Sequence, residues 1–368
     1  MELRMTEVAW NPLYGTPVYP AERYAALARR IGGILKTNND VLLVQAEAVV
    51  ALEAVATSLA RPGLSLLNIV TGPYGNWFGQ WLRRGGTHVV DIVAQPGLPI
   101  ELDAIAVTLD TNPNVSALAL VHAESASGIL NPLPEIIALA KARGIVTIVD
   151  AVASVGGHAL DVDALGIDIA VIGPQKALGG PAGVSALSVS QHAWELVLHD
   201  GAPRDSILSL ADLKAWVDAG CGALPGTPAP LEFFALEASL DQVEAEGLAQ
   251  IVARHEKAAS ASRAGLAALG TSLWVPAEQG SNLVTTVSLP SGLESTSVTG
   301  FAAGLGVELT LGVGTGLSHL IRINHTGARA SFPTVLANVV AYGAALRQAG
   351  FPANIGAASE AVTKNYCG

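Results

Sequence analysis

The sequence predicts an α/β fold with a doubly wound, mainly parallel sheet, followed by a smaller α+β domain. Short runs rich in Val and Ile alternate with helical patterns up to about residue 190. These runs lack the polar alternation of half-exposed strands, which favours strands that are covered on both faces. Beyond them, two long helical patterns follow one another, and shorter patterns of both kinds come after.

The alternation defines the expected elements of the larger domain. The runs that predict strands are residues 64–70, 87–94, 115–121, 145–149, 167–172 and 184–189. The helical patterns between them are residues 47–59, 74–84, 101–109 and 134–143. The last helix ends in Lys141, Arg143 and Gly144, the cations and glycine that are typical of a helix C-terminus.

The C-terminal part of the chain has a different pattern. Two consecutive helices are expected at residues 231–246 and 248–269, with Gly247 between them. Strands are then expected at residues 283–289, 307–311 and 319–324, and helices near residues 294–305 and 332–349. We therefore expect a large domain over residues 1–250, which includes the N-terminal segment, and a small domain over residues 251–368.

The composition excludes a disordered chain and argues against several kinds of partner. Of the 368 residues, 50% are hydrophobic and only 14% are charged, so the chain has enough apolar surface to form a core. The net charge of −11 argues against nucleic acid, because such binding needs a basic surface. Two cysteines, Cys221 and Cys367, cannot build a disulfide framework, and no Cys/His cluster indicates a metal.

A mean hydropathy of +0.43 raises the question of a membrane span, which requires roughly 20 consecutive apolar residues. The best candidate, residues 330–346, is interrupted by Ser331, Pro333, Asn338 and Gly343, and we expect a buried helix there. The first ten residues, MELRMTEVAW, contain no apolar stretch of signal-peptide length. We expect a soluble, cytoplasmic protein that does not contact a membrane.

Two opposite charges follow neighbouring expected strands. Asp150 ends the strand at residues 145–149, and Lys176 lies in the Gly173-Pro-Gln-Lys segment after the strand at residues 167–172. Ligands of open parallel sheets bind beyond the carboxyl ends of the strands, and a lysine amine in a dry pocket can form a Schiff base. Taken alone, the pair also fits an ordinary loop lysine and a turn aspartate.

Three segments favour the chemical interpretation: HisAlaGluSerAlaSerGly at residues 122–128, ValAspAlaValAlaSerValGlyGly at 149–157 and GlyProGlnLysAlaLeuGlyGlyProAlaGly at 173–183. In content, order and spacing they resemble the class V aminotransferases, which are pyridoxal 5'-phosphate enzymes of fold type I. Within that family the resemblance is to the alanine–glyoxylate and serine–glyoxylate aminotransferases and to the pyridoxamine–pyruvate transaminases. It covers about residues 10–350.

The resemblance implies roles for the residues of these motifs. Lys176 would be the Schiff-base lysine and would move the proton, and Asp150 would keep the pyridine nitrogen protonated. Ser125 would lie near the phenolic oxygen of the ring. Tyr74, in GlyProTyrGlyAsnTrpPheGly, would stack on one face of the ring, and Val152 would lie under the other. Without the resemblance, Tyr74 would be a core aromatic.

Arg322 matches the arginine that binds the substrate carboxylate in this family. It lies in the apolar segment HisLeuIleArgIleAsnHisThrGly, where an arginine needs a bidentate partner. A structural ion pair is the alternative. The preceding glycine-rich segment, residues 312–316, lies between two strands without a following helix, so we expect a connector there rather than a nucleotide loop.

The segment that would bind the cofactor phosphate departs from the family pattern. At residues 45–54 the small or hydroxyl residues of the family give way to Glu47, after Ala46, and to Val49. The tyrosine that the family's partner subunit supplies is replaced by Leu224, whereas Thr227 is kept. Gln175 and Thr227 remain as polar phosphate partners, and the composite site implies a homodimer.

An acid at position 47 also occurs in pyridoxamine–pyruvate transaminases, which use the unphosphorylated vitamer as a substrate. We therefore expect a transaminase that takes free pyridoxal or pyridoxamine, with Glu47 contacting the substrate. One departure is Val313, since those enzymes have a second arginine in the loop before Arg322. The alternatives are a conventional alanine/serine–glyoxylate-type aminotransferase in which Glu47 only caps a helix, a lyase or desulfurase, and a non-catalytic vitamer-binding protein.

Overall fold

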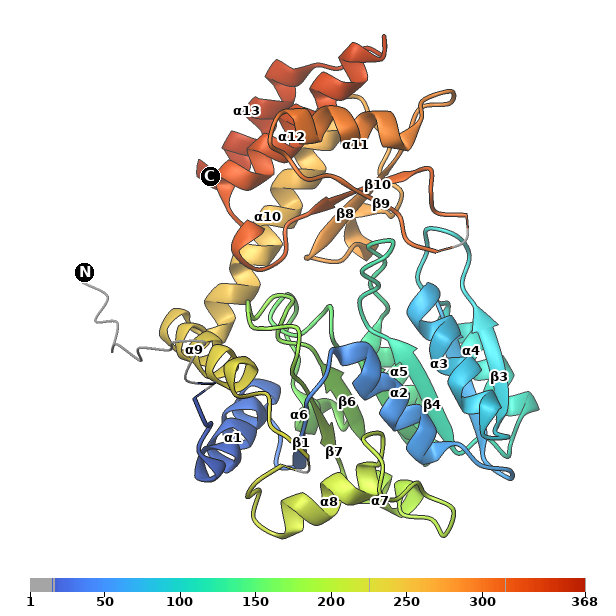
Figure 1. Cartoon of the computed structure of the whole chain (residues 1–368). Helices are drawn as coiled ribbons and strands as arrows, with labels where there is room; N and C mark the ends of the chain where they lie inside the picture. The colour runs from blue at the N-terminus through green and yellow to red at the C-terminus, as the bar shows by residue number, and fades with distance from the viewer. Residues whose placement is uncertain (1–14, 16, 225, 315, 368) are drawn as a thin grey trace.

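The computed structural model describes residue 15 and residues 17–224, 226–314 and 316–367, so the N-terminal segment considered for a signal peptide lies outside the described residues. A seven-stranded sheet occupies one end of the molecule and a three-stranded sheet the other, with the long helix α10 beside the smaller sheet (Figure 1). This is the α/β fold that the sequence predicts, with a separate C-terminal antiparallel unit. The domain boundary after residue 250 stays a prediction.

The seven-stranded sheet has the order β1-β7-β6-β5-β4-β2-β3. Its strands are β1 (Asp40–Val44), β2 (Ser65–Val70), β3 (His88–Val93), β4 (Ala117–Val121), β5 (Val146–Asp150), β6 (Ile169–Ile172) and β7 (Ser185–Val189). Neighbouring strands from β3 to β6 are parallel, as predicted. The strand β7 is antiparallel to both β6 and β1, so the expectation of a parallel strand at residues 184–189 was wrong. No helix joins β6 to β7, and a parallel return needs a crossover connection.

Helices cover both faces of this sheet because successive strand residues point to opposite sides. Leu118 and Leu120 of β4 belong to one apolar cluster, whereas Ala117 and Ala119 belong to the other. The first cluster includes side chains of α1 (Tyr24–Leu35), α4 (Leu102–Thr111), α5 (Leu133–Lys141) and α9 (Pro230–Glu246). The second includes side chains of α2 (Ala48–Leu59), α3 (Pro73–Arg84), α7 (Gln191–Val197) and α8 (Leu210–Asp218).

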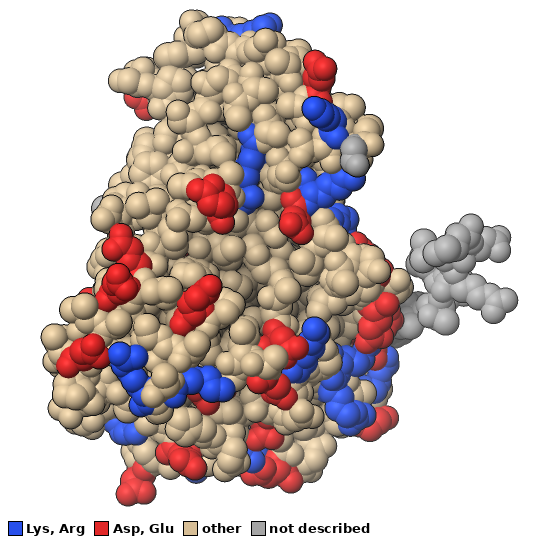
Figure 2. Space-filling model, turned by 180° about the vertical axis from the view of Figure 1, so that it is seen from behind, with Lys and Arg blue, Asp and Glu red and all other residues tan. Residues whose placement is uncertain are grey.

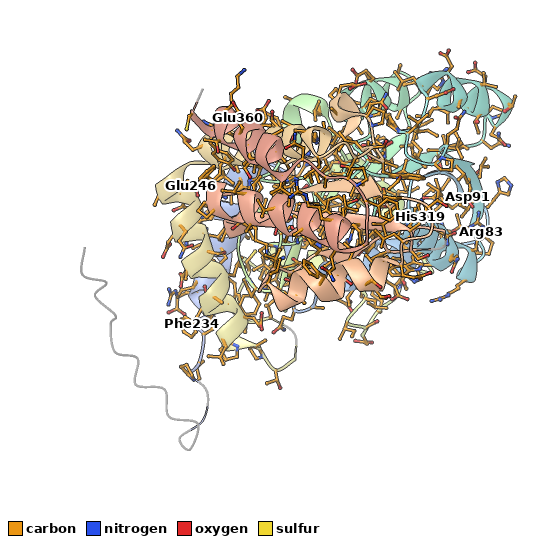
Figure 3. All side chains as sticks on the ribbon, turned by 90° about the horizontal axis from the view of Figure 1, so that it is seen from above. Arg83, Asp91, Phe234, Glu246, His319 and Glu360 are labelled. Carbon is orange, nitrogen blue, oxygen red and sulfur yellow. The ribbon has the colours of Figure 1, made fainter. Side chains whose placement is uncertain are left out.

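The edge strand β3 is an exception to the burial that the sequence pattern predicts. Val93 is 71% exposed, because β3 has only one neighbour in the sheet. Seen from above, the ion pair of Arg83 and Asp91 marks this edge, and Phe234 and Glu246 of α9 mark the opposite side of the molecule (Figure 3). The expected helices and strands up to β7 are otherwise present within a few residues, but β1, α1 and the short helix α6 (Val162–Leu165) were not predicted. Beyond β7, the helices α7 and α8 and the last helix, Ile355–Cys367, were not predicted either.

The smaller sheet has the order β8-β10-β9 and is antiparallel. Its strands are β8 (Val284–Ser288), β9 (Thr310–Leu311) and β10 (Leu320–Asn324), so only two residues of the strand expected at 307–311 pair. Its core also includes residues of α10 (Leu248–Ala268), α11 (Ser295–Gly304), α12 (Phe332–Gln348) and α13 (Ile355–Cys367). Short 3-10 turns in the described part of the chain are η2 (Ala21–Arg23), η3 (Ala277–Gln279) and η4 (Gly327–Arg329).

One face of the molecule shows no single concentrated patch of charge (Figure 2). On the face drawn in Figure 2, basic and acidic side chains are interspersed around the large sheet, and the part around the small sheet is mostly uncharged. No described helix is long and apolar enough to cross a membrane. The apolar stretch at residues 330–346 forms most of α12, whose side chains Val335, Val339 and Tyr342 are fully buried.

Candidate active site

The carboxyl ends of three adjacent strands bring the predicted residues together. Ser125 follows β4, Asp150 ends β5 and Lys176 follows β6, and these strands are neighbours in the sheet. All three side chains line one cavity, the ring cavity. Its other lining residues are Glu47, Ala48, Val49, Leu52, Tyr74, Val121, Ala123, Val152 and Ala153.

Asp150 is a buried carboxylate whose one described hydrogen bond comes from the backbone N–H of Val152, 2.9 Å from Oδ1. Burial raises its pKa to about 6, because desolvation disfavours the charged form. The Val152 N–H and the charge of Lys176 oppose that shift, and Glu47 adds to it. A buried carboxyl with one donor favours a cationic ligand group beside it.

Tyr74 lies in the first turn of α3, and Val152 lies just past β5, so both reach the ring cavity. The Tyr74 ring contacts Trp77 edge-on, with the ring centroids 5.3 Å apart. Burial raises the pKa of the Tyr74 hydroxyl, and a hydrogen bond with the side chain of Ser125 lowers it. A flat aromatic ring can therefore bind between an aromatic and an aliphatic side chain.

Lys176 is half-buried in the loop after β6 and faces two cavities. The second, the substrate cavity, has a volume of about 550 Å³ and shares Ser125, Ala153 and Lys176 with the ring cavity. Gly327 of the small domain approaches closely here, since a Cβ at this position would lie 3.1 Å from the Lys176 carbonyl oxygen. The lysine loop is thus held between both parts of the molecule.

Arg322 enters the substrate cavity from β10 of the small sheet. Its Nη1 donates to the Ser125 carbonyl oxygen over 2.8 Å, and its buried Nε has no hydrogen-bond partner. Burial lowers its pKa from the ordinary value, which Tyr74 and Glu124 oppose. No ion pair fixes Arg322 among the described residues, and a guanidinium with a free N–H suits a carboxylate ligand.

Glu47 both caps a helix and lines the ring cavity. It is the N-cap of α2, and its Oε2 accepts from the Val49 backbone N–H over 2.8 Å. Its Oε1 accepts from Nε2 of Gln175 over 2.9 Å. The carboxylate therefore occupies a backbone donor and a side-chain donor that an anionic ligand would otherwise use.

Two of the predicted site residues lie outside both cavities. Ala46 packs against the apolar cluster that includes α2, and Thr227 is exposed in the single chain. Leu224, which stands where the family has a tyrosine, is buried in the core and does not line either cavity. Whether Thr227 reaches the site of a partner subunit stays a prediction.

The sequence analysis missed three residues with charged groups at the site. Glu124, which belongs to the first resembling segment, is completely buried next to Ser125. Glu308 and Arg329 line the substrate cavity and form an ion pair, with Nη2 and Oε2 2.5 Å apart. Glu124 could have been recognised from the sequence, because it is an acidic residue between Ala123 and Ser125, shortly after the strand β4. The other two come from segments whose proximity depends on tertiary packing.

Neither cysteine lies at these cavities. Cys221 lies between α8 and α9 and packs against the large core, and Cys367 is exposed at the end of α13. No group of three or more metal-ligating side chains lies together in the part of the chain that the structure describes. The residues present fit a protonated pyridine ring, given the buried Asp150 and the flanking side chains of Tyr74 and Val152. Glu47 fits a phosphate group less well.

Comparisons with known proteins identify the family of the chain. The class-V aminotransferase family matches residues 26–337 of the chain. A pyridoxamine–pyruvate transaminase from Mesorhizobium japonicum is 35% identical over 331 residues, which cover 89% of this chain and 84% of the relative. An alanine–glyoxylate aminotransferase from Callithrix jacchus is 31% identical, over 81% of this chain and 73% of the relative.

Solved structures with the same fold include the pyridoxamine–pyruvate aminotransferase of Mesorhizobium loti, with a TM-score of 0.91 and 33% identity. That match covers 96% of this chain and 92% of the other. An alanine–glyoxylate aminotransferase from Nostoc sp. has a TM-score of 0.83 and 27% identity, over 91% and 90% of the two chains. The extent of the family match and the identity to these relatives show that the chain is an enzyme of the class-V aminotransferase family, with the fold type I architecture.

Proposed function

We propose that this enzyme moves an amino group between an amine or amino acid and a 2-oxo acid, and that it takes free pyridoxal or pyridoxamine as a substrate. The observation that carries the second part is the carboxylate of Glu47 on the wall of the ring cavity. The relatives named pyridoxamine–pyruvate transaminase support the same choice. The family implies a pyridoxal cofactor, which in this proposal is replaced by the unphosphorylated vitamer.

The bound pyridoxal ring supplies an electron sink for the reacting carbon. The chain's own residues do the rest. Asp150 would hold the proton on the ring nitrogen, and Tyr74 and Val152 would pack against the two faces of the ring. The Lys176 amine would lie at the reacting carbon and carry the proton to and from it, and Arg322 would bind the substrate carboxylate beside Ser125.

Charge repulsion at Glu47 would disfavour a phosphate ester. Two like unit charges about 4 Å apart repel by roughly 4 kcal/mol at an effective dielectric constant near 20. That energy corresponds to about a thousandfold in affinity. A hydroxymethyl group would instead donate a hydrogen bond to the Glu47 carboxylate.

The second candidate is a conventional aminotransferase that holds pyridoxal 5'-phosphate. The alanine–glyoxylate aminotransferases among the relatives favour it. In that case Gln175 would turn its amide from Glu47 to the phosphate. The replacement of an arginine by Val313, which is 40% exposed, is the other departure from the pyridoxamine–pyruvate pattern.

Binding titrations with pyridoxal and with its phosphate distinguish the two candidates. We expect wild type to bind pyridoxal more tightly than the phosphate ester. Glu47→Ala should improve binding of the ester by up to a few kcal/mol and weaken pyridoxal by about 1–3 kcal/mol. Because the ligands respond in opposite directions, a general loss of stability cannot produce this result.

Two further variants separate charge from structure. Glu47→Gln keeps a carbonyl oxygen for the Val49 N–H, so a gain for the phosphate ester in this variant isolates the charge. Glu53→Ala, on the same helix and paired with Arg84, should leave both affinities unchanged. Tighter binding of the phosphate ester by wild type would make Glu47 only a helix cap and establish the conventional aminotransferase.

We also propose a homodimer with composite active sites. Thr227 lies exposed in a Pro/Gly-rich loop of the single chain, where a second subunit could receive it. Such shared sites need a large, stable interface. Sedimentation of the active enzyme at decreasing concentration should give a dimer throughout, whereas an active monomer would contradict the proposal.

A further inference from the structure

Glu124 is a buried acid at the active site that the proposed reaction does not use. It is completely buried, and its Oε1 accepts from the Ala126 backbone N–H over 3.0 Å. Its Oε2 is buried without a hydrogen-bond partner. A Cβ on residue 72 would lie 2.1 Å from Oε2, so this position of the carboxyl requires Gly72.

The loop that carries Glu124 also holds Arg322. The loop closes on itself, because the Gly128 N–H donates to the Glu124 carbonyl oxygen over 2.7 Å. The small domain then binds the same loop: Arg322 Nη1 donates to the Ser125 carbonyl oxygen, and Thr286 Oγ1 donates to that of Ser127. Glu124 and the guanidinium of Arg322 therefore lie at the same contact between the loop after β4 and the small sheet.

Four charged or titratable groups act on the Glu124 carboxyl. Its pKa is raised to about 8, chiefly by burial and also by Asp150 at the end of β5, against the Ala126 N–H, which lowers it. Arg322 from β10 and Lys176 from the loop after β6 lower it. Tyr74 of α3 is also coupled to it electrostatically. Glu124 is thus largely protonated at neutral pH and ionised in mild alkali.

We propose that Glu124 is a positioning residue that balances the charge of Arg322, and that it takes up a proton from solvent when a substrate carboxylate binds to Arg322. The inference rests on the carboxylate role proposed for Arg322. In mild alkali, an ionised Glu124 compensates the guanidinium of the ligand-free enzyme. A bound carboxylate takes over that compensation, and a second buried anion beside it is then unfavourable, so a proton moves onto Glu124 and no other bond changes.

Propionate is a suitable probe, because it carries one carboxylate and has neither an amine nor an oxo group to react. Its binding to the purified enzyme would be measured by calorimetry at about pH 7 and pH 9, in two buffers of different ionisation enthalpy. We expect wild type to take up close to one proton per propionate at the higher pH and to bind about tenfold more weakly there. Glu124→Gln, which resembles the protonated form, should match wild type at neutral pH and lose both effects.

The outcomes distinguish the role of Glu124 from the carboxylate-binding role proposed for Arg322. A pH dependence that persists in Glu124→Gln would assign the titration to Lys176 or Tyr74 and overturn the role of Glu124. The absence of proton uptake in wild type would do the same, without relying on the folding of any variant. Propionate binding that survives in Arg322→Met, or that is absent in wild type, would instead refute the carboxylate role of Arg322. None of these results depends on which vitamer the enzyme prefers.

Discussion

Two carboxylates line the same cavity, and their surroundings differ. Asp150 is 8% exposed, has one described donor, and its pKa is raised to about 6. Glu47 is exposed, lies at the N-terminus of α2 and accepts hydrogen bonds from Val49 and Gln175. Asp150 therefore gains most from a cationic partner, whereas Glu47 already has its donors and presents a negative charge to any ligand.

Under the proposed function, one end of the ligand would be recognised by attraction and the other by exclusion. The Asp150 end fits the family resemblance, and in the proposed function a pyridinium nitrogen would supply the missing charge. The Glu47 end is where the chain departs from the family, and it disfavours a second anion. The predictions below test each end. They begin with Lys176, which lines the same cavity as both carboxylates.

The largest effect is expected for Lys176→Ala. No other lysine lines the ring cavity in the described part of the chain, so transamination should fall by several orders of magnitude. Turnover would be followed by formation of the 2-oxo acid product. Lys214→Ala, at a lysine paired with Asp40 and Asp218 outside the cavity, is the control and should keep its activity. Turnover like that of wild type in Lys176→Ala would refute the assignment.

Asp150→Asn should keep the ligand but lower kcat strongly, by about a hundredfold or more. Without the anion the ring nitrogen loses its proton, and one pKa unit corresponds to about 1.4 kcal/mol. The spectrum of the bound vitamer together with single-turnover rates would measure both parts. An unchanged kcat would show that Asp150 does not hold the ring nitrogen.

The affinity of wild type for pyridoxal should depend on pH through Asp150. Its pKa of about 6 means that the carboxylate is present above that pH and is protonated below it. Binding should therefore weaken as the pH falls below about 6, by up to tenfold per pH unit. Pyridoxal would be titrated into wild type and Asp150→Asn over this pH range. If Asp150 causes the pH dependence, the affinity of the variant should not change with pH.

The smallest effect is expected for Gln175→Ala. Removing the donor to Glu47 should change pyridoxal binding by only about 0.5–1.5 kcal/mol. The phosphate ester is the sharper probe, because a weaker ester complex in this variant would make Gln175 a phosphate ligand. An ester affinity that stays the same or improves would agree with exclusion by Glu47.

Much of the large domain was predictable from local pattern. The runs that became β4, β5 and β6 are mostly apolar, because helices cover both sides of these strands, and their order places Ser125, Asp150 and Lys176 at one edge. The direction of β7 and the exposure of β3 were not predictable in this way. They depend on which strands become neighbours, and a run of apolar residues carries no information on that.

Residue order alone was enough to identify the chemical groups of the site: a lysine and a carboxylate after adjacent parallel strands, a matching serine and tyrosine, and an acid at the start of α2. How these groups act on one another depends on the folded chain. Folding buries Glu124 in the loop that holds Arg322, and it places Glu47 against Gln175, 128 positions along the chain. The physical reason is that charge interactions depend on distance and burial in the folded chain, which residue order does not specify.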